Sequence, residues 1–410
     1  MRIAVWHNLP SGGGKRALFD HVRGLLDRGH HIESWCPPTA DQAFLPLSTV
    51  VPEHVVDLAW PPEPRGTDRF LVTSSTVRAL RAMDEHCRES AREMESRGFD
   101  VLFANACTFF RTTPIARFTS LPSVLYLGEP YRPLYEASPK LLWEARPAGS
   151  TSVLDIASLR SAVYDLRSTR NGRVQVREER HNATAFRKIL VNSYYSRESV
   201  KRAYGLDSDV CYLGIDSEHF VDYGYPREQF VISLGSFVRA KNAELSIEAI
   251  GAMTVPRPRL IWIANIVDEG YRKTMLDLAT KLGVELDVRI SVAQEDVLNL
   301  LNRASVMLYT PHLEPFGLAP IEANACGLPV VAIAEGGVRE TIVDRENGLI
   351  VDSDPKALAD ALSRLLSDPP FARKLGEAAR EAVRAKWSLA SAAERLEEKL
   401  VRYSTRAGVT

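Results

Sequence analysis

Short apolar runs alternate along this chain with longer segments in which apolar residues recur every three or four positions. Runs rich in Val, Ile and Leu predict buried β-strands, and the three-to-four spacing predicts amphipathic helices. In the first half, strands are predicted at residues 2–7, 31–36, 100–104 and 123–127. Helices are predicted between them, including residues 14–28 and 74–97.

The same alternation begins again near residue 230. Strands are predicted at residues 230–234, 259–264, 305–310, 330–333 and 348–351, followed by helices at 355–366 and 370–403. Strands that alternate with helices form parallel sheets covered by helices on both faces. The pattern therefore predicts an α/β fold with two Rossmann-like, doubly wound domains.

Length and composition agree with two domains and exclude several classes of protein. A chain of 410 residues with 45% hydrophobic content can form two cores of roughly 200 residues each. The net charge of −1 gives no overall field for nucleic acid, so no nucleic-acid partner is expected. Five scattered cysteines without a Cys-x-x-Cys spacing predict neither disulfides nor a zinc site. No leader precedes the first strand, so a cytoplasmic location is expected.

The most informative segment for function is residues 313–329, which contains two carboxylates. We expect Glu314 in a loop and Glu322 in the first turn of the following helix. Backbone N–H groups of Phe316, Gly317 and Leu318 lie at this helix start, where free donors and the helix dipole attract phosphate. Carboxylates accept hydrogen bonds from vicinal hydroxyls. The segment therefore predicts a site for a nucleotide sugar.

The run Glu-Pro-Phe-Gly-Leu-x-Pro-x-Glu-Ala-x-Ala-Cys-Gly-Leu-Pro resembles the signature of GT4-type retaining glycosyltransferases, which have the GT-B fold. The resemblance implies two Rossmann-like domains that face a cleft. It also implies that Glu314 holds the transferred sugar and that Glu322 holds the ribose. The alternative is a loop and a helix that only pack a core, with both carboxylates in solvent.

A glycine-rich turn, Gly12-Gly13-Gly14, joins the first predicted strand to the first helix. Without Cβ atoms, its backbone N–H groups can approach a diphosphate closely. Leu9 and Arg16 stand where a Walker loop requires a glycine and a hydroxyl residue, so this is not a P-loop. In the GT4 family a Gly-Gly loop faces the donor phosphates, which implies donor binding here. A tight turn without a ligand is the alternative.

Two cations, Arg239 and Lys241, follow the strand that opens the second domain. Positive side chains on such a loop would neutralise a diphosphate leaving group. The segment resembles the family's Gly-Arg-x-x-x-x-Lys-Gly loop, with Ser236 at the arginine position and Asn242 at the last glycine. Lys241 matches the family lysine, Arg239 is the candidate for the missing charge, and Ser236 is assigned to donor binding. A solvated, charged helix start is the alternative.

On the first domain, residues 124–133 follow a predicted strand and lead toward the same cleft. The family often has a histidine here beside the transferred sugar, and Gly128 occupies that place. We therefore expect no catalytic histidine at this position and assign only Glu129, Tyr131 and Arg132 to the acceptor side. A proline-governed turn in which Arg132 pairs with Glu129 is the alternative.

The expected domain boundaries follow from two further resemblances. Residues 211–220 resemble the family's crossover between domains, with Tyr212-Leu213 in place of Pro-Asn. Trp387 lies in a segment that resembles the family's C-terminal segment, which returns to the first domain. The assignment is a first domain at residues 1–220, a second at 221–385 and a returning helix at 386–410.

Together these features predict a retaining glycosyltransferase that uses a UDP- or GDP-linked sugar and requires neither a metal nor a cofactor. Glu314, Lys241 and Arg239 are the candidate catalytic residues. Since no protein nucleophile is evident, a front-face displacement fits, in which the enzyme positions the reactants and stabilises charge. The alternatives are a nucleotide-sugar epimerase and a non-catalytic nucleotide-sugar binding protein. The dinucleotide fingerprint of NAD-dependent enzymes is absent.

The acceptor is left open among a glycan, a lipid-linked molecule and a small molecule. Residues 160–188 contain eight Arg or Lys against three Asp or Glu, with aliphatic residues between them. Such a segment can rest on anionic lipid, which would give weak peripheral contact with the inner face of a membrane. The alternative is a solvated helix pair whose arginines pair with Asp165, Glu178 and Glu179.

Overall fold

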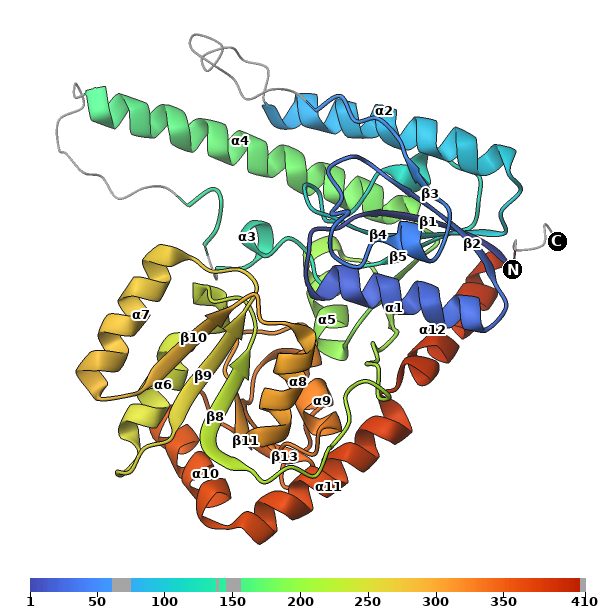
Figure 1. Cartoon of the computed structure of the whole chain (residues 1–410). Helices are drawn as coiled ribbons and strands as arrows, with labels where there is room; N and C mark the ends of the chain where they lie inside the picture. The colour runs from blue at the N-terminus through green and yellow to red at the C-terminus, as the bar shows by residue number, and fades with distance from the viewer. Residues whose placement is uncertain (61–74, 138–139, 145–155, 406–410) are drawn as a thin grey trace. The chain divides into compact units, whose positions relative to one another are not determined.

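Each half of the chain forms a parallel sheet covered by helices, in a computed structural model that describes residues 1–60, 75–137, 140–144 and 156–405. The chain divides into two compact units (Figure 1). The first comprises Met1–Asn192, Ser196–Cys211 and Ala393–Thr410, and the second comprises Ser193–Tyr195 and Tyr212–Ala392. The units therefore divide after residues 211 and 392, where the sequence assignment placed boundaries after 220 and 385.

In the first unit, the described strands form one sheet in the order β3-β2-β1-β4-β5-β6-β7, and neighbouring strands are parallel. Its strands are β1 (Arg2–Asn8), β2 (His31–Cys36), β3 (Glu53–Val55), β4 (Val101–Cys107), β5 (Ser123–Tyr126), β6 (Lys188–Val191) and β7 (Ser208–Val210). Its helices are α1 (Gly13–Asp27), α2 (Ser75–Ser96), α3 (Arg132–Tyr135), α4 (Ile156–Ala185) and α5 (Tyr194–Tyr204). This strand order is that of a Rossmann fold.

The core of the first unit lies where α2, the end of α4 and α5 cover one face of this sheet. Trp6, Met83, Leu125 and Val200 are among its fully buried side chains. The predicted helix 74–97 is α2, although residue 74 lies outside the described residues. Among the described residues, no helix combines the length and the apolar character that a bilayer crossing requires.

The second unit repeats the same topology. Its described strands form a parallel sheet in the order β10-β9-β8-β11-β12-β13. The strands are β8 (Glu228–Leu234), β9 (Arg259–Ala264), β10 (Leu286–Ile290), β11 (Ala304–Tyr309), β12 (Val330–Ile333) and β13 (Gly348–Val351). The helices are α6 (Ala243–Ala252), α7 (Glu269–Leu282), α8 (Gln294–Arg303), α9 (Leu318–Ala325), α10 (Pro355–Ser367) and α11 (Pro369–Lys386). The predicted α/β class with two Rossmann-like domains is thus confirmed.

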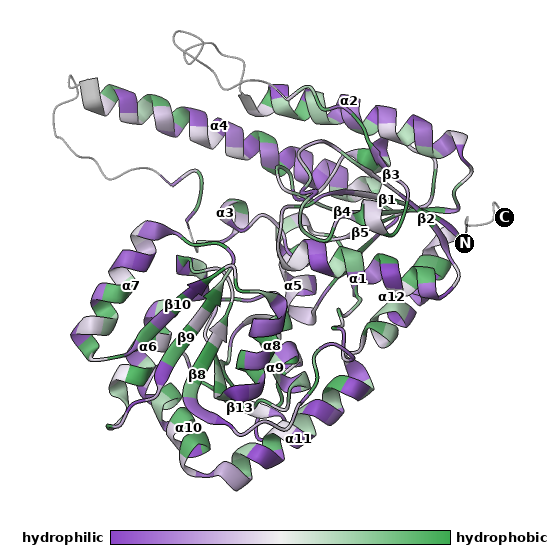
Figure 2. Ribbon diagram, in the orientation of Figure 1, coloured by the Kyte–Doolittle hydropathy of each residue, from purple (hydrophilic) through white to green (hydrophobic). Residues whose placement is uncertain are grey.

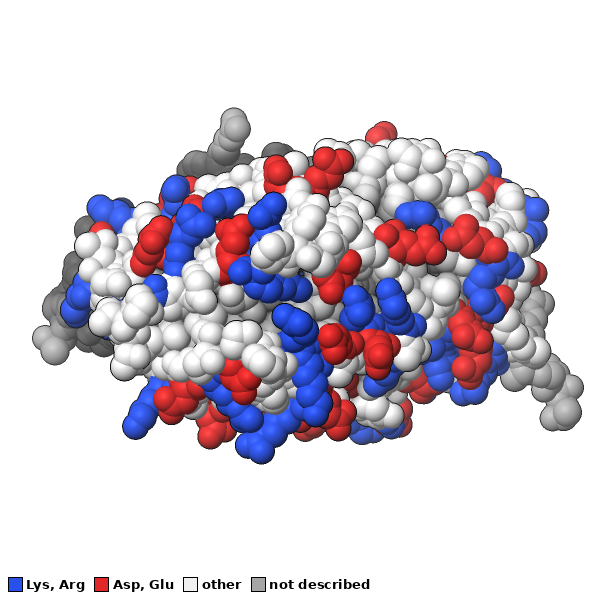
Figure 3. All heavy atoms as spheres, turned by 60° about the horizontal axis from the view of Figure 1, so that its bottom comes forward, with Lys and Arg blue, Asp and Glu red and all other residues white. Residues whose placement is uncertain are grey.

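Helices α6, α7 and α10 share one hydrophobic core with the second sheet, in which Val231, Ile247, Trp262 and Leu362 are buried. In Figure 2 strands β8 and β9 are mostly hydrophobic, and the helices around them carry both hydrophobic and hydrophilic residues. The exterior is polar and of mixed sign. On the face drawn in Figure 3, basic and acidic side chains are interspersed, in keeping with the net charge of −1.

The single helix predicted at residues 370–403 is wrong, because the structure divides it into α11 and α12 (Leu389–Ser404). Ser388 Oγ accepts a hydrogen bond from Ser391 N at 3.2 Å, which caps the start of α12. Between the helices, Trp387 O accepts a hydrogen bond from Ile215 N at 2.8 Å. From residue 393 onward α12 belongs to the first unit, as expected for the returning helix.

Short or polar strands escaped the sequence prediction. Strands β3 and β7 have three residues each, too few for a recognisable apolar run. Strand β6 has four residues and directly follows the charged end of α4. Strand β10 is an edge strand that carries Asp287 and Arg289, which form an ion pair at 2.9 Å. Its residues are half-buried or exposed, and the two charged residues interrupt its apolar run.

Candidate active site

In the second unit, the sheet reverses its direction of strand addition between β8 and β11. Ligands of open α/β sheets bind outside the carboxyl ends of the strands at such a switch point. The loop after β8 contains a 3-10 helix, η4 (Arg239–Lys241), and the loop after β11 leads into α9. The sequence-predicted residues Lys241 and Glu314 therefore lie on adjacent loops at this point.

Lys241 and Glu314 form an ion pair in which Nζ and Oε2 are 2.5 Å apart. The two side chains are 27% and 17% exposed, so water screens the pair only in part. The aliphatic stem of Lys241 lies along Gly235, where an added Cβ would stand 3.7 Å from Lys241 Cδ. The structure thus brings together the ammonium and the carboxylate that the sequence assigned to phosphate and sugar.

Tyr309, the last residue of β11, supports Glu314 from the end of the strand. Burial raises the pKa of Tyr309 well above its usual value, and the charge and hydrogen bond of Glu314 add to the shift. The neutral hydroxyl is therefore a donor to the Glu314 carboxylate. Sequence reasoning missed Tyr309. The signal that could have found it is a tyrosine that closes a buried strand just before a motif loop.

The loop that carries Glu314 is fixed through its backbone by neighbouring segments. Its hydrogen bonds are His312 N to Ala240 O (3.2 Å), Leu313 N to Glu335 Oε2 (3.2 Å), Gly337 N to Glu314 O (2.7 Å) and Ser193 Oγ to Pro315 O (2.6 Å). Positioned catalytic groups lose efficiency when they shift by even about 1 Å. These contacts therefore bear directly on the placement of the Glu314 carboxylate.

Two glycines that the sequence reasoning did not single out, Gly336 and Gly337, allow the segment after β12 to approach this loop. Gly336 has a φ of +61°, and an added Cβ there would overlap the backbone of Glu314. An added Cβ at Gly337 would overlap the carbonyl group of Pro315. Both positions therefore require glycine for a close backbone approach.

Replacing Gly337 with alanine is expected to lower kcat/KM by about 100-fold, because the new methyl group must push the Glu314 loop from its position. Overpacking of this kind also destabilises by about 1–3 kcal/mol. Steady-state kinetics and thermal unfolding measure the two effects. Gly270→Ala is the matched control, since an added Cβ there is 3.3 Å from the Asp268 carboxylate and meets no backbone. Equal kinetics of the two variants would contradict the assignment.

Helix α9 begins earlier than the sequence suggested, which changes the position of Glu322. Gly317 adopts φ +90° as the N-cap, so the helix starts at Leu318, two residues before Pro320. Glu322 therefore lies in the second turn, and its expected place in the first turn is wrong. Its side chain is buried, with 5% of its surface exposed. The alternative in which both carboxylates lie in solvent does not fit these exposures.

Phe316, at the start of the same helix, has a packing role. Its side chain is 2% exposed, and its ring centroid lies 6.1 Å from that of Tyr212 and 5.6 Å from that of Trp387. Only its backbone N–H remains as a candidate for binding phosphate, together with those of Gly317 and Leu318. The first N–H groups of a helix have no partner within the helix. Their assignment to a donor phosphate stays a prediction.

Arg239 and Ser236 lie on the loop after β8, and their contacts differ from those of Lys241. Arg239 is exposed, and its charge acts on the buried hydroxyl of Tyr271 on α7. Ser236 Oγ donates to Asn265 Oδ1 at 3.5 Å, an exposed and long contact. Among the described residues, Lys241 is the cation paired with Glu314. The structure does not bring Arg239 to this pair.

The glycine turn of the first unit follows β1, beside the switch point between β1 and β4. Gly12 is the N-cap of α1, and Gly13 and Gly14 form its first turn, so the helix starts one residue earlier than predicted. An added Cβ at Gly12 would meet nothing within 4 Å. The turn is therefore open, as binding a phosphate requires, and that role stays a prediction.

The remaining first-unit candidates follow β5. Tyr131 is the N-cap of α3, and the guanidinium of Arg111 lies 5.8 Å from its ring centroid. Arg132 donates to Glu136 at 2.8 Å. Glu129 is half-buried, and Gly128 lies beside Asn192, whose Nδ2 would be 3.4 Å from an added Cβ. The acceptor role of Glu129, Tyr131 and Arg132 stays a prediction.

A buried polar cluster lies under the glycine turn and was missed from the sequence. His7, Cys36 and Glu53 place ligand atoms within 4.8 Å of one another, the spacing of a metal site. His7 Nε2 is 3.0 Å from Glu53 Oε1. However, the fully buried ammonium of Lys15 acts on these groups, and burial raises the pKa of the Cys36 thiol to about 12. A protonated thiol and a neighbouring cation fit a metal poorly.

Comparison with known proteins finds similarity mainly in the second unit. Residues 216–382 match the model of the family described as glycosyl transferases group 1. The chain is similar to the alpha-1,3/1,6-mannosyltransferase ALG2 of Homo sapiens, with 27% identity over 245 residues, 53% of this chain and 58% of the relative. The chain spans about half the length of the curated relatives it matches.

Solved structures extend the likeness over nearly the whole chain. Sucrose-phosphate synthase of Thermosynechococcus elongatus has a TM-score of 0.72 at 17% identity, with 98% of each chain covered. HepE of Anabaena in complex with UDP has a TM-score of 0.71 at 17% identity, covering 98% of this chain and 100% of that one. Such identities establish the fold alone. Residues 216–382, which include Lys241, Glu314 and Glu322, thus match the group 1 glycosyltransferases, on a chain with the GT-B fold.

Proposed function

We propose that this protein is a retaining glycosyltransferase that moves a sugar from a nucleotide-diphosphate sugar to an acceptor hydroxyl without a metal ion. The observation that carries the proposal is the Lys241–Glu314 pair at the switch point of the second sheet, with the start of α9 directly after it. One cation and one partly buried acid there offer complementary groups to a phosphate and to sugar hydroxyls.

The diphosphate is the leaving group, and its charge grows as the glycosidic bond breaks. Lys241 and the N–H groups at the start of α9 are placed to stabilise that charge. Fixed donors of this kind supply the stabilisation that a divalent cation supplies in other transferases. This is the support for metal independence.

The two carboxylates hold the donor by its hydroxyl groups. Glu314 accepts from the transferred sugar and Glu322 from the ribose. Glu314 is engaged by Lys241 and Tyr309, which lowers its reactivity and argues against a nucleophilic role. In the front-face reaction the bond from the anomeric carbon to the phosphate oxygen breaks. The acceptor oxygen bonds to the same face of that carbon, and the acceptor proton passes to the departing diphosphate.

The donor is proposed to carry uridine or guanosine diphosphate. HepE, a neighbour in fold, has been solved with UDP and with UDP-glucose, and ALG2 is named for mannosyl transfer. Uridine-linked hexoses and guanosine-linked mannose are therefore the first donors to test. The acceptor is a glycan, a lipid-linked molecule or a small molecule, and the reaction is placed in the cytoplasm.

Incubation of the full chain with UDP-, GDP- and ADP-hexoses in the presence of EDTA tests this function. One nucleotide series is expected to release free nucleotide and free sugar slowly without an acceptor, because water replaces the acceptor hydroxyl. Chelation is expected to leave the rate unchanged, and loss of activity that Mg²⁺ restores would overturn metal independence. An epimerase would convert the donor without releasing sugar, and a binding protein would leave it intact.

A further inference from the structure

Helix α4 directs two of its acidic side chains into the interior of the first unit. Glu179 is fully buried and accepts hydrogen bonds from the Tyr204 hydroxyl at 2.9 Å and from Gln175 Nε2 at 3.1 Å. Burial raises the pKa of Glu179, and these donors oppose the shift. A buried carboxylate held in this way has no charge to offer at the outer surface.

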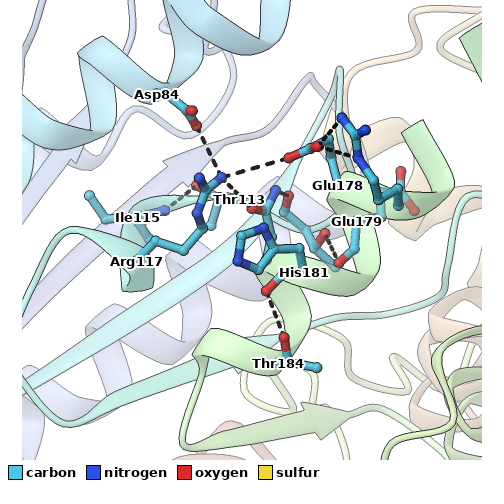
Figure 4. Close-up of polar contacts among 11 residues, drawn as sticks. Asp84, Thr113, Ile115, Arg117, Glu178, Glu179, His181 and Thr184 are labelled. Carbon is cyan, nitrogen blue, oxygen red and sulfur yellow. Dashed lines mark hydrogen bonds and ion pairs between the residues drawn. The ribbon is translucent and has the colours of Figure 1, made fainter. Parts of the chain in front are cut away.

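Glu178 belongs to the same inward network, shown in Figure 4. Arg117 lies 3.8 Å from Glu178 Oε2 and 3.3 Å from Asp84 Oδ1. It also donates to Asn182 at 3.2 Å. The Glu178 side chain is 16% exposed. Glu178 is therefore shared between Arg117, which comes from outside α4, and Arg177 of α4 itself, whose Nη2 lies 2.6 Å from Glu178 Oε1 as the solvated alternative expected.

The side of α4 opposite Glu179 carries a row of seven residues, called here the outer stripe, that contains no acidic residue. Its members recur in alternating steps of four and three residues, which places them on one helix face. They are Leu159, Val163, Leu166, Arg170, Arg173, Arg177 and Arg180. At about 1.5 Å per residue the stripe is roughly 32 Å long. Its first part is aliphatic and its second part is cationic.

The aliphatic side chains of the stripe are exposed, although residues of this kind are usually buried. Leu159 is 65% exposed and Leu166 is 72% exposed, and Val163 between them is 39% exposed. Large apolar residues exposed side by side on one helix mark an interaction surface more often than an ordinary solvated face. Exposing these aliphatic side chains to water is unfavourable unless another surface covers them.

The cationic part keeps its charges available. Among the described residues, Arg170, Arg173 and Arg180 form no ion pair, and Arg177 is 71% exposed although it contacts Glu178 at 2.6 Å. A groove of about 930 Å³ runs along this part and is lined by Trp143, Thr169, Arg173, Val176, Arg177, Arg180, His181 and Thr184. Trp143 packs on α4 at Gly172. An indole beside arginines is typical of side chains at a membrane interface.

We propose that the outer stripe of α4 docks the first unit on an anionic lipid surface. Arg170, Arg173, Arg177 and Arg180 would meet phosphate headgroups, and Leu159, Val163 and Leu166 would enter the acyl boundary. Nucleic acid would satisfy the arginines but would leave the exposed leucines in water, so a lipid surface accounts for both halves. The docking does not depend on the proposed sugar transfer.

Co-sedimentation with vesicles tests the proposal. The full chain is expected to bind vesicles of phosphatidylcholine with 30% phosphatidylglycerol at low salt, and not vesicles of phosphatidylcholine alone. The triple variant Arg170→Gln/Arg173→Gln/Arg180→Gln is expected to bind about 100-fold more weakly, because each arginine near an anionic surface contributes about tenfold or less. Raising the salt to 0.5 M is also expected to weaken wild-type binding, because salt screens the attraction between the arginines and the headgroups.

A matched control removes three exposed cations elsewhere, in Lys356→Gln/Lys374→Gln/Arg384→Gln, and is expected to bind like the wild type. Leu166→Ser tests the aliphatic half and is expected to weaken binding several-fold. Equal binding of the two triple variants, equal binding to both kinds of vesicle, or competition by 10 mM inorganic phosphate or by RNA at low salt would each overturn the proposal. Nucleotide release from a soluble donor, measured in parallel, reports on the transferase separately.

Discussion

Replacing Lys241 with methionine is expected to lower kcat for donor turnover by about 100- to 1,000-fold. Methionine retains an aliphatic stem along Gly235 but removes the ammonium that pairs with Glu314. Charge on the departing diphosphate then develops without its main cation. Because the pair is mostly shielded from water, with 27% and 17% exposure, leaving Glu314 without its cation is expected to lower the free energy of unfolding by about 1–3 kcal/mol. Steady-state kinetics and thermal unfolding measure both quantities.

Arg239→Met is the comparison variant on the same 3-10 helix. Arg239 is exposed and lies toward Tyr271, so its effect on kcat is expected to be smaller. Lys241→Arg keeps the charge but changes its shape and hydration, and is expected to recover part of the activity. Wild-type kcat in the Lys241→Met variant would remove this residue from the mechanism. An effect of Arg239→Met as large as that of Lys241→Met would contradict the distinct roles assigned to the two cations.

Replacing Glu314 and Glu322 together with alanine is expected to weaken donor binding by at least about 100-fold. Hydrogen bonds to charged groups contribute about 1.5–3 kcal/mol each, and the variant loses those from two carboxylates. A donor at 100 times its Kd stabilises the wild type by about 2.7 kcal/mol. The same donor concentration is expected to stabilise the variant by well under 1 kcal/mol. Thermal unfolding with and without donor measures the difference.

Each variant is compared with itself, with and without donor. A lower stability caused by removing the buried Glu322 therefore does not affect the measured donor effect. Glu346→Ala/Glu377→Ala removes two exposed acids of the second unit and is expected to keep the full donor effect. A donor shift in the Glu314→Ala/Glu322→Ala variant equal to that of the wild type would refute the assignment of both acids.

The parts of the site that local sequence determines were predictable. A strand, a loop and a helix start follow one another within a few residues, so the positions of Lys241 and Glu314 after β8 and β11 could be expected. Parallel topology then brings the ends of adjacent strands together at one edge. The motifs therefore placed both residues on loops at this edge, and the ion pair between them was not predicted.

Contacts between distant segments were not predictable in the same way. Gly337 reaches the Glu314 loop from the end of β12, and Ser193 reaches Pro315 across 122 positions of sequence. Such contacts depend on strand order and register, which one sequence does not display. Glu322 was misplaced by one turn because the left-handed Gly317 starts α9 early.

The discontinuous make-up of the first unit affects the order in which the chain can fold during synthesis. Asp209, in β7, receives a hydrogen bond from the Tyr403 hydroxyl at 2.6 Å, and Arg28 donates to Glu397 at 2.6 Å. Residues 397–403 leave the ribosome only after the whole of the second sheet has been made. The nascent second unit can therefore close its sheet first. Until α12 arrives, the first unit lacks these partners, and incompletely packed surface of this kind favours aggregation.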